Sequence, residues 1–404
     1  MTTATVPTDV FADLVGQDEA VQTLRRAAAA AGELLAAGDG DPPLSAGAMT
    51  HAWIFTGPPG SGRSVAARAL AAALQCVYGQ GCGRCAGCHT TRAGTHADVR
   101  FVVPDGLSIS VGEMRALVLR AASTPSGGRW QVLVIEDADR LTEAAGNALL
   151  KAIEEPPPRT VFLLCTPSTH PDDISVTIRS RCRVVSLRQP PAEAVAQVLA
   201  ERDGVPAETA VWAAAAAQGH VGRARRLAQD PQARERRDAV LAVPRRLTTV
   251  GACFDAASAL IAAAEAEAEV AEIDAAERTA LQTALGAGGT GRGAAGAARG
   301  TAGQIKELER RQKSRATRAQ RDALDRALVD LAGFYRDVLV SALRAPVAPV
   351  HTDVAGLTGA AAEKWTAESA LRRLEAVLSC REAITGNVKP RIAVEAMMLS
   401  LWRG

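Results

Sequence analysis

Four cysteines follow directly after a glycine-rich, phosphate-loop-like segment, and this arrangement restricts the possible folds more than any other feature of the chain. The segment GPPGSGRS covers residues 57–64, the helix-forming run VAARALAAAL follows it, and the cysteines stand in CVYGQGCGRCAGC. Four thiolates with two successive C-x-x-C steps can complete a tetrahedral Zn²⁺ site without any distant part of the chain. The predicted ligands of this structural zinc, in an insertion over residues 76–88, are Cys76, Cys82, Cys85 and Cys88.

Free thiols and a disulfide pair are the simpler interpretations of these cysteines. Disulfides need an oxidising compartment, whereas the opening residues MTTATVPTDVFADLVGQDEA lack the basic and apolar regions of a signal peptide. The sequence also has no apolar run of roughly 18 residues, so no membrane span is expected. We therefore expect a cytoplasmic protein with no membrane partner. The other cysteines are scattered and are predicted to be small buried apolar side chains: Cys165, Cys182, Cys253 and Cys380.

Length and charge set further limits. A chain of 404 residues can form two or three domains with hydrophobic cores. Its 46 basic and 44 acidic residues nearly balance, at a formal net charge of +2, which excludes a globally basic coat for nucleic acid. Any contact with DNA must therefore be local or shared with partners.

Strand-like apolar runs alternate with helical stretches through the first half of the chain, which predicts a parallel sheet flanked by helices. From residue 190 to about residue 227 the pattern is typical of a small helical lid, and it stays helical to the end. The predicted fold class is therefore α/β with an all-α C-terminal region. The strand-like runs cover residues 51–57, 99–104, 130–137, 160–166 and 182–187.

Two stretches of the second half differ from the rest. Residues 286–303, GAGGTGRGAAGAARGTAG, have few side chains that could build a core and predict a flexible linker. Residues 304–343 show a long amphipathic pattern that is dense in Arg and Lys at first and carries apolar residues at helical spacing later. We interpret the apolar stripe as a bundle core and the charges as a solvated face. A helix that contacts another subunit is the alternative.

The glycine-rich segment matches the phosphate-loop pattern G-x-x-x-x-G-K-[S/T] except at the lysine. In that pattern backbone N–H groups curl around phosphates, the Lys reaches the outer phosphates and the hydroxyl holds Mg²⁺. Here Arg63 replaces the Lys. The planar guanidinium keeps the charge but is wider than an ammonium, so the change is not conservative. The pattern leaves binding of ATP or ADP with Mg²⁺ open and predicts loss of hydrolysis.

A pair of acidic residues also predicts loss of hydrolysis. The apolar run 132–135 ends in Glu136 and Asp137, whereas a hydrolysing enzyme of this class would have Asp for the Mg²⁺ shell followed by Glu for the attacking water. Each side chain therefore differs by one methylene group from the usual order. Positional errors of that size are costly because catalysis of phosphoryl transfer is mostly positioning. The simpler alternative is that two acids merely end a strand.

Together these segments resemble the clamp-loader family of AAA+ proteins, over almost the whole chain. The resemblance implies a RecA-like AAA+ domain with a zinc knuckle over residues 1–187, a helical lid over 188–245 and a helical collar domain over 246–404. The segments that carry it are FADLVGQDEAVQTL, HAWIFTGPPGSGRS, the four cysteines, HADVRFV, LTEAAGNALLKAIEEPP, VTIRSRC and NVKPRIAVEAMML.

The resemblance also implies roles for individual residues. In the family the SRC segment places an arginine finger on the ATP of the adjacent subunit, and Arg181 occupies that position. The alternative for Arg181 is an ion pair with Glu154 or Glu155 of its own chain. The implied nucleotide-binding residues are Gly57, Pro58, Pro59, Gly60, Ser61, Gly62, Arg63, Ser64, Val65, Glu136, Asp137, Thr166 and Arg223.

Within the family, motor subunits of the gamma/tau type have the loop lysine, acids in the order Asp-Glu and an arginine at the fourth position of G-x-x-R. This chain has Arg63, the reversed acids and Gly222 at that fourth position, with Arg223 one position late. These departures, together with a retained Arg181, resemble the non-motor delta-prime type, a stator.

The resemblance implies partners as well. Such a subunit joins gamma/tau and delta subunits in a five-membered ring, which places a sliding clamp on primer-template DNA as part of the DNA polymerase III holoenzyme during replication. An active ATPase motor and a zinc-dependent adaptor unrelated to DNA are the alternatives. Arg63 disfavours the first, and the SRC segment disfavours the second.

Overall fold

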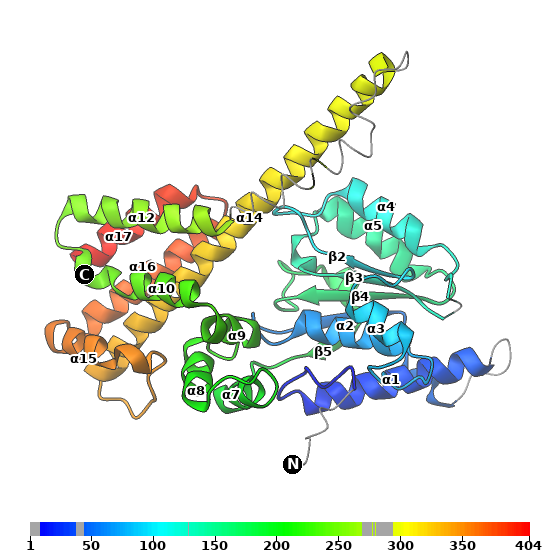
Figure 1. Ribbon diagram of the computed structural model, residues 1–404, viewed down its shortest axis with the longest axis horizontal. Coiled ribbons are helices and arrows are strands. Elements are labelled where there is room, and N and C mark those ends of the chain that lie inside the picture. Colours follow the sequence, from blue (N-terminus) through cyan, green and yellow to red (C-terminus); the bar gives the residue numbers. More distant parts are fainter. Residues whose placement is uncertain (1–8, 38–43, 128, 269–276, 278, 280–293) are drawn as a thin grey trace. The chain divides into compact units, whose positions relative to one another are not determined.

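The chain forms two compact units (Figure 1). The structure is a computed structural model that describes residues 9–37, 44–127, 129–268, 277, 279 and 294–404. Unit 1 comprises Met1–Pro104 and Ser108–Ala228, and unit 2 comprises Asp105–Leu107 and Gln229–Gly404. The predicted division into three domains at residues 187 and 245 stays a prediction.

Unit 1 is built on a five-stranded parallel sheet with the strand order β2-β3-β4-β1-β5. The central strands β1 and β4 are buried along their whole length, as expected of a parallel sheet covered on both faces. Thr56 at the end of β1 is in register with Thr166 of β4 and Ser186 of β5. The strands are β1 Ala52–Thr56, β2 Val99–Val102, β3 Gln131–Ile135, β4 Thr160–Thr166 and β5 Arg183–Ser186.

Helices cover both faces of this sheet. Figure 1 shows α1, α2 and α3 on one face and α4 and α5 on the other. Alternation along β1 explains the two layers, because Trp53 and Phe55 belong to one buried apolar cluster and Ile54 to a second. The helical elements of unit 1 are α1 Asp18–Ala37, η1 Leu44–Ala48, α2 Arg63–Leu74, α3 Ala86–Arg92, α4 Val111–Ala121, η2 Ala138–Arg140, α5 Glu143–Glu154, α6 Val176–Arg179, α7 Ala192–Glu201, α8 Ala207–Ala216 and α9 Val221–Gln229.

Unit 2 is helical in its described part. The apolar stripe predicted in residues 304–343 is confirmed as core, since Leu324, Leu328, Leu331, Phe334 and Val338 are all buried. The predicted fold class, a parallel sheet with helices on both faces followed by a helical C-terminal region, is therefore confirmed. The elements are α10 Pro231–Leu241, α11 Val243–Arg246, α12 Val250–Ala268, α14 Ala294–Ala342, η3 Thr352–Val354, α15 Ala355–Lys364, α16 Ala367–Thr385 and α17 Pro390–Arg403.

The predicted Gly/Ala-rich linker is wrong in its second part. Residues 286–293 lie outside the described residues, whereas residues 294–303 form the start of α14. Alanine has the highest helix propensity, and a helix that continues to residue 342 offsets the cost of the interspersed glycines.

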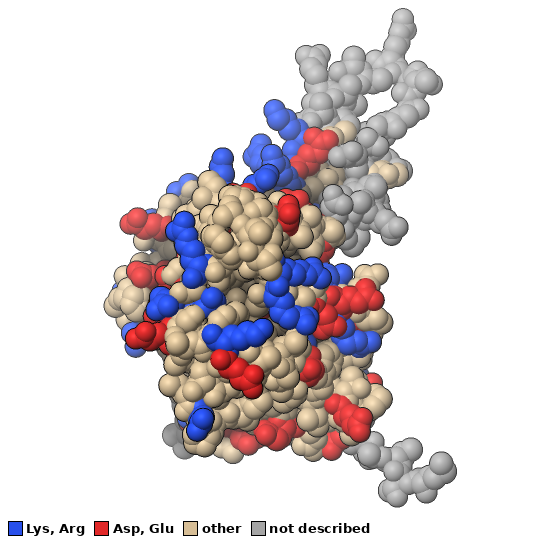
Figure 2. All heavy atoms as spheres, turned by 90° about the vertical axis from the view of Figure 1, so that its left-hand side faces the viewer, with Lys and Arg blue, Asp and Glu red and all other residues tan. Residues whose placement is uncertain are grey.

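The charged side chains of α14 form a solvated face, as predicted. Arg310 and Arg311 are 71% and 61% exposed, and each lies within 3.5 Å of Glu307 one turn earlier. Figure 2 shows Lys and Arg side chains close to Asp and Glu over the face that it draws.

Of the helices in the described part of the chain, none combines the length and the apolar composition that a membrane crossing requires.

A buried polar cluster fixes the segment between α14 and α15. Arg237 of α10 contacts the carboxylate of Asp353 at 2.5 and 3.0 Å and the Nδ1 atom of His351 at 2.9 Å. His351 is fully buried, and its backbone N–H donates to Asp337 at 2.8 Å. Burial and the neighbouring Arg237 lower the pKa of His351, so its ring is the neutral acceptor that the guanidinium requires.

Replacing Arg237 by Ala should destabilise unit 2 by about 3 to 5 kcal/mol, because the change removes a buried guanidinium together with its contacts with Asp353 and with the buried Asp330. Denaturant unfolding measures the loss. The control is Arg236→Ala, since Arg236 is about one-third exposed where it meets Asp230 and Glu267, and it should lose about 1 kcal/mol or less. Equal losses in the two variants would contradict this account.

Candidate functional site

The loop between β1 and α2 has a backbone conformation that depends on its glycines. Gly60 and Gly62 have φ angles of 87° and 91°, in the left-handed region that residues with a Cβ rarely adopt. A Cβ on Gly60 would also lie 2.7–2.9 Å from atoms of His220. Gly62 is the N-cap of α2, so the N–H groups of the first turn of α2 follow the loop directly and can receive an anion.

A cavity of about 580 Å³ lies beside this loop, within unit 1. Residues 59–65 form one wall, and Val10, Asp13, Leu14 and Val15 of the N-terminal segment form another. Its third wall comes from α7, α9 and the residues next to them, including Arg202, His220 and Arg225. The volume and the mixture of apolar and cationic walls suit a phosphorylated small molecule.

Some of the residues predicted to bind nucleotide lie at this cavity and others do not. Pro59 to Val65 line it. Thr166 is fully buried at the end of β4 and donates to the carbonyl of Ser168 at 3.0 Å. Arg225, rather than the predicted Arg223, lines the cavity from α9. The predicted residues that are not among the lining residues are Gly57, Pro58, Glu136, Asp137, Thr166 and Arg223.

Arg63 brings an unsatisfied cationic group to the cavity wall. Its Nη1 atom is buried and makes no hydrogen bond with the described residues. A buried donor of a charged group without a partner carries a desolvation cost. The residues present therefore fit an anion at this position, because an anionic oxygen would satisfy the donor.

Glu136 connects the end of β3 to α2. The Oγ atom of Ser64 donates to Oε2 of Glu136 at 3.1 Å, and Nη2 of Arg68 lies 2.8 Å from Oε1. The guanidinium of Arg68 also stacks 4.1 Å above the ring of Phe101. Arg68 was missed at the sequence level, although a residue four positions after Ser64 lies on the same face of the helix.

Asp137 has a different environment from Glu136. It adopts a left-handed backbone conformation, with φ of 52°, as the N-cap of η2. Its carboxylate lies 4.0 Å from Nε of Arg140. Two residues later, burial and then the charge of Asp137 raise the pKa of Asp139. The acids after β3 thus do not form two equivalent groups facing the loop hydroxyl.

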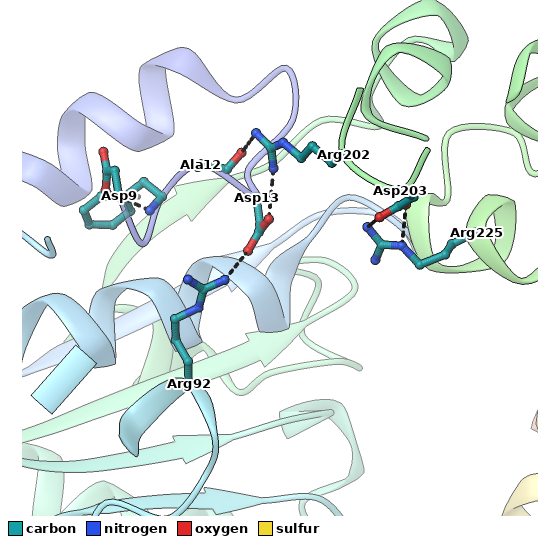
Figure 3. A network of polar contacts seen from close by, with 8 residues as sticks. Asp9, Ala12, Asp13, Arg92, Arg202, Asp203 and Arg225 are labelled. Atoms are coloured by element: carbon teal, nitrogen blue, oxygen red, sulfur yellow. Dashed lines mark hydrogen bonds and ion pairs between the residues drawn. The ribbon is translucent and has the colours of Figure 1, made fainter. Parts of the chain in front are cut away.

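Asp13 joins three parts of unit 1 at the cavity (Figure 3). Its Oδ2 atom lies 3.0 Å from Nη2 of Arg92 at the end of α3, and its Oδ1 atom lies 2.9 Å from Nη1 of Arg202 after α7. Arg225 makes two contacts with Asp203, at 2.7 and 3.1 Å. These residues come from distant segments, so no sequence pattern could have assembled them.

Gln17 ties the start of the chain to the phosphate loop. It is 5% exposed, and its side-chain amide donates to the carbonyls of Ser61 at 3.3 Å and Arg188 at 2.5 Å. Its Oε1 atom accepts from the N–H of Arg188 at 3.1 Å. Gln17 lies in the FADLVGQDEA segment, which the sequence marked as family-like without assigning this residue a role.

The four predicted metal ligands come together, as expected. The sulfur atoms of Cys76, Cys82, Cys85 and Cys88 all lie within 4.8 Å of one another. Sγ of Cys76 and Sγ of Cys85 are 3.9 Å apart, close to the separation of about 3.8 Å that a tetrahedron with bonds of 2.3 Å requires. All the cysteines are free thiols. The residues present therefore fit a metal ion with four sulfur ligands and no open position.

Backbone N–H groups lower the pKa of two cysteines of this cluster. Burial alone would raise the pKa of the Cys76 thiol, but hydrogen bonds from the N–H groups of Cys82, Tyr78 and Gln80 outweigh it and lower the pKa to about 6. The pKa of Cys85 is also lowered, because the N–H groups of Cys88 and Val77 outweigh its burial. Burial raises the pKa of Cys88. Two sulfurs are thus favoured as thiolates, the form that binds metal.

Arg181 lies outside the cavity of its own chain. Its Nη2 atom is 2.8 Å from Oε1 of Glu154, and its Nη1 atom donates to the carbonyl of Thr177 at 3.1 Å. The side chains of Arg181 and Glu154 are 39% and 40% exposed. The alternative interpretation predicted this pair, but an exposed pair is worth at most about 1 kcal/mol and leaves the guanidinium available to another anion.

The first half of the chain is similar in sequence to subunits of DNA polymerase III. Residues 42–191 match the family described as DNA polymerase III, delta subunit. The chain is 33% identical over 209 residues to DNA polymerase III subunit gamma/tau of Mycobacterium tuberculosis H37Rv, covering 50% of this chain and 33% of that protein. It is 37% identical over 153 residues to subunit delta' of Escherichia coli K12, covering 37% of this chain and 45% of that protein.

A further relative and a solved structure complete the comparison. Subunit delta' of Bacillus subtilis 168 is 34% identical over 160 residues, covering 39% of this chain and 48% of that protein. The branch-migration motor RuvB of Thermotoga maritima has a TM-score of 0.38 at 20% identity, covering 59% of this chain and 67% of that chain. The chain spans less than half the length of these sequence relatives, and their identities do not separate the gamma/tau type from the delta' type.

Protein purified without chelator should contain one tightly bound metal ion per chain, because the cysteine cluster offers four sulfur ligands in one place. Cys85→Ser should lose the ion and lower the stability of residues 76–92, since metal binding and local folding are coupled. Cys182→Ala, a change outside the cluster, should keep it. Elemental analysis measures the content, and metal-free wild-type protein would contradict the assignment.

Proposed function

We propose that this chain, whose residues 42–191 match the family described as DNA polymerase III, delta subunit, is a non-motor clamp-loader subunit of the delta-prime type. In this role it assembles with gamma/tau and delta subunits and helps the ring to place the sliding clamp on primer-template DNA. It supplies Arg181 to ATP held by a neighbouring subunit. The observation that carries the proposal is Arg63, which replaces lysine in a loop that otherwise keeps the phosphate-binding pattern.

The phosphate loop retains the groups that binding requires. The glycine conformations and the start of α2 direct backbone N–H groups toward the cavity, and Arg63 offers an unpaired buried donor. Ser64 and Glu136, whose side-chain oxygens lie 3.1 Å apart, are the residues that would hold the Mg²⁺ of a bound ATP or ADP. A bound nucleotide with Mg²⁺ would supply the phosphoanhydride and its counter-ion. The described residues then act by holding it.

The acids after β3 support binding without hydrolysis. Glu136 is already occupied by Ser64 and Arg68, so it is poorly placed to orient a water. Asp137 is one methylene group shorter than the usual second acid and lies beside Arg140. Phosphoryl transfer depends mostly on positioning, and a displaced water-orienting carboxylate is therefore costly.

Arg181 has the properties that a residue acting in trans requires. It is more than one-third exposed, it does not line the cavity of its own chain, and its ion pair with Glu154 is exposed. Exchange of that carboxylate for a phosphate is favourable, because phosphate offers more charge and a planar guanidinium binds it through two hydrogen bonds.

The proposed metal is Zn²⁺ with a structural role. Four thiolate ligands in a small tetrahedron favour zinc, and a filled coordination sphere leaves no place for water or substrate. The cluster joins the end of α2 to α3. Zinc would therefore fix the fold of residues 76–92 and take no part in chemistry.

An active ATPase motor of the gamma/tau type is the second candidate. It is favoured by the 33% identity to the gamma/tau subunit of M. tuberculosis and by the contact between Ser64 and Glu136, which resembles an arrangement for Mg²⁺. The two candidates differ in whether the purified chain turns over ATP.

The purified chain should show ATP turnover at the background level, even where nucleotide binds. Arg63→Lys alone should not restore activity, because Glu136, Asp137 and Gly222 remain in place. Phosphate release with Mg²⁺ measures the rate. Metal-dependent turnover in the wild type that disappears in Ser64→Ala would identify a motor instead.

Arg181→Ala should reduce clamp-stimulated ATP hydrolysis and clamp loading once the chain is reconstituted with motor subunits and the clamp. An arginine finger contributes a factor of roughly 10³ to 10⁵ to the rate of hydrolysis at the site it serves. The assembly should therefore lose the ATP hydrolysis of that one site and keep the hydrolysis of the others. The stability of the variant should change by less than about 1 kcal/mol. The control is Arg179→Ala, an exposed arginine two positions away.

The opposite pattern would refute the role of Arg181. If Arg181→Ala unfolds more easily while the reconstituted assembly hydrolyses ATP and loads clamps at the normal rate, the residue serves only its own chain through Glu154.

A further inference from the structure

The segment of residues 9–15, here called the N-terminal segment, packs directly on the cysteine module of residues 76–92. The N–H of Val10 donates to the carbonyl of Gly81 at 3.0 Å. Gly81 has a φ of 69°, and a Cβ there would lie 2.5 Å from Cγ2 of Val10. Val10 and Phe11 belong to the same buried apolar cluster as Cys76 and Cys88. A change in the fold of the module would therefore disturb the packing of this segment.

The same segment forms a wall of the cavity. Val10, Asp13, Leu14 and Val15 all line it. On the opposite wall, a Cβ on Gly62 would lie 3.7 Å from Cδ2 of Leu14, which shows how closely the segment approaches the phosphate loop. The N-terminal segment thus contacts the cysteine module and also lines the space in which a nucleotide would lie.

Asp13 forms ion pairs with two arginines, Arg92 and Arg202 (Figure 3). Arg92 is the last residue of α3, the short helix whose N-cap is Cys85, and it lies 3.0 Å from Asp13. Arg202 follows α7, lies 2.9 Å from Asp13 and also donates to the carbonyl of Ala12 at 2.6 Å. All three charged residues line the cavity. One carboxylate therefore joins the cysteine module to the helices on the far side of the cavity.

We propose that Asp13, Arg92 and Arg202 form a latch through which metal binding by the cysteine module sets how firmly the N-terminal segment and the end of α7 are held around the ligand of the cavity. The proposal rests on the proposed function in taking that ligand to be a nucleotide. The three residues are positioning residues. They act by holding the N-terminal segment and the end of α7 in place.

The dependence on metal follows from the size of α3. A helix of seven residues is not stable in isolation, and its first turn is capped by the sulfur of Cys85, which accepts from the N–H of Cys88. Metal binding fixes both cysteines and hence the helix. Arg92 lies four residues after Cys88, so its place opposite Asp13 depends on that helix.

Charge favours the same conclusion. Asp13 is an anion on a cavity wall, and Arg92 and Arg202 neutralise it from two sides. Loss of Arg92 removes a cation from the wall and leaves Asp13 less balanced. Both effects weaken the binding of a polyanion such as a nucleoside diphosphate.

The first test measures the affinity of metal-loaded protein for fluorescent N-methylanthraniloyl ADP with Mg²⁺. Arg92→Ala and Arg202→Ala should each weaken binding about two- to fivefold, the effect expected of exposed ion pairs. The double variant should lose less than the product of the two factors, because both arginines act through Asp13. Arg84→Ala, which removes an exposed arginine of the same module, should bind like the wild type.

The second test does not need nucleotide. Hydrogen exchange of residues 9–15 should speed up several-fold in metal-loaded Arg92→Ala and in chelated wild type, and should stay unchanged in Arg84→Ala. If the wild type binds no ADP, the assignment of the cavity to nucleotide fails and the exchange data alone decide on the latch. Equal exchange in wild type, Arg92→Ala and chelated protein, or the same increase in Arg84→Ala, would overturn it.

Discussion

Burial of helix α2 against the sheet is the interaction on which the site of unit 1 depends. Ala66, Ala67 and the run from Ala69 to Leu74 are buried, so the position of the helix is fixed along its whole length of about 18 Å. Its first turn follows Gly62 and carries Arg63 and Ser64 at the cavity. Its last turn leads to Cys76, the first residue of the four-cysteine cluster. The small side chains of this helix let it lie close to its neighbours.

The proposed function requires this part of the chain to bind a nucleotide without hydrolysing it, and the position of α2 is compatible with both. The glycines, the helix N-terminus and the Ser64 hydroxyl form a receptor for phosphate, and a static receptor needs only charge and hydrogen-bond donors. Hydrolysis needs a water oriented to within a fraction of a bond length, and here Glu136 is paired with Arg68 while Asp137 lies beside Arg140. A chain can thus hold nucleotide as a fixed structural element and act on a neighbour through an exposed arginine.

Local chemistry allowed much of the fold and part of the site to be predicted. Apolar runs located the strands, of which β1, β3 and β4 are buried on both faces. The C-x-x-C steps located the four-cysteine cluster, because its members are close in sequence. Asp13, Arg92 and Arg202 were missed because they come from three distant segments that only the fold brings together. Arg225 was missed because the turn before α9 decides which arginine faces the cavity. The prediction for residues 294–303 was wrong. Their glycines suggested a linker, whereas their alanines form the start of a long helix.

The central claim is that this chain contributes an arginine, and no hydrolysis, to a clamp loader. The most direct measurement is ATP hydrolysis by a loader assembled from this chain and motor subunits whose own phosphate-loop lysines have been replaced by alanine. With the clamp and primer-template DNA present, every remaining competent phosphate loop would belong to this chain. The account predicts hydrolysis at the background level. Clamp-stimulated hydrolysis in that assembly, abolished by Ser64→Ala in this chain, would contradict it.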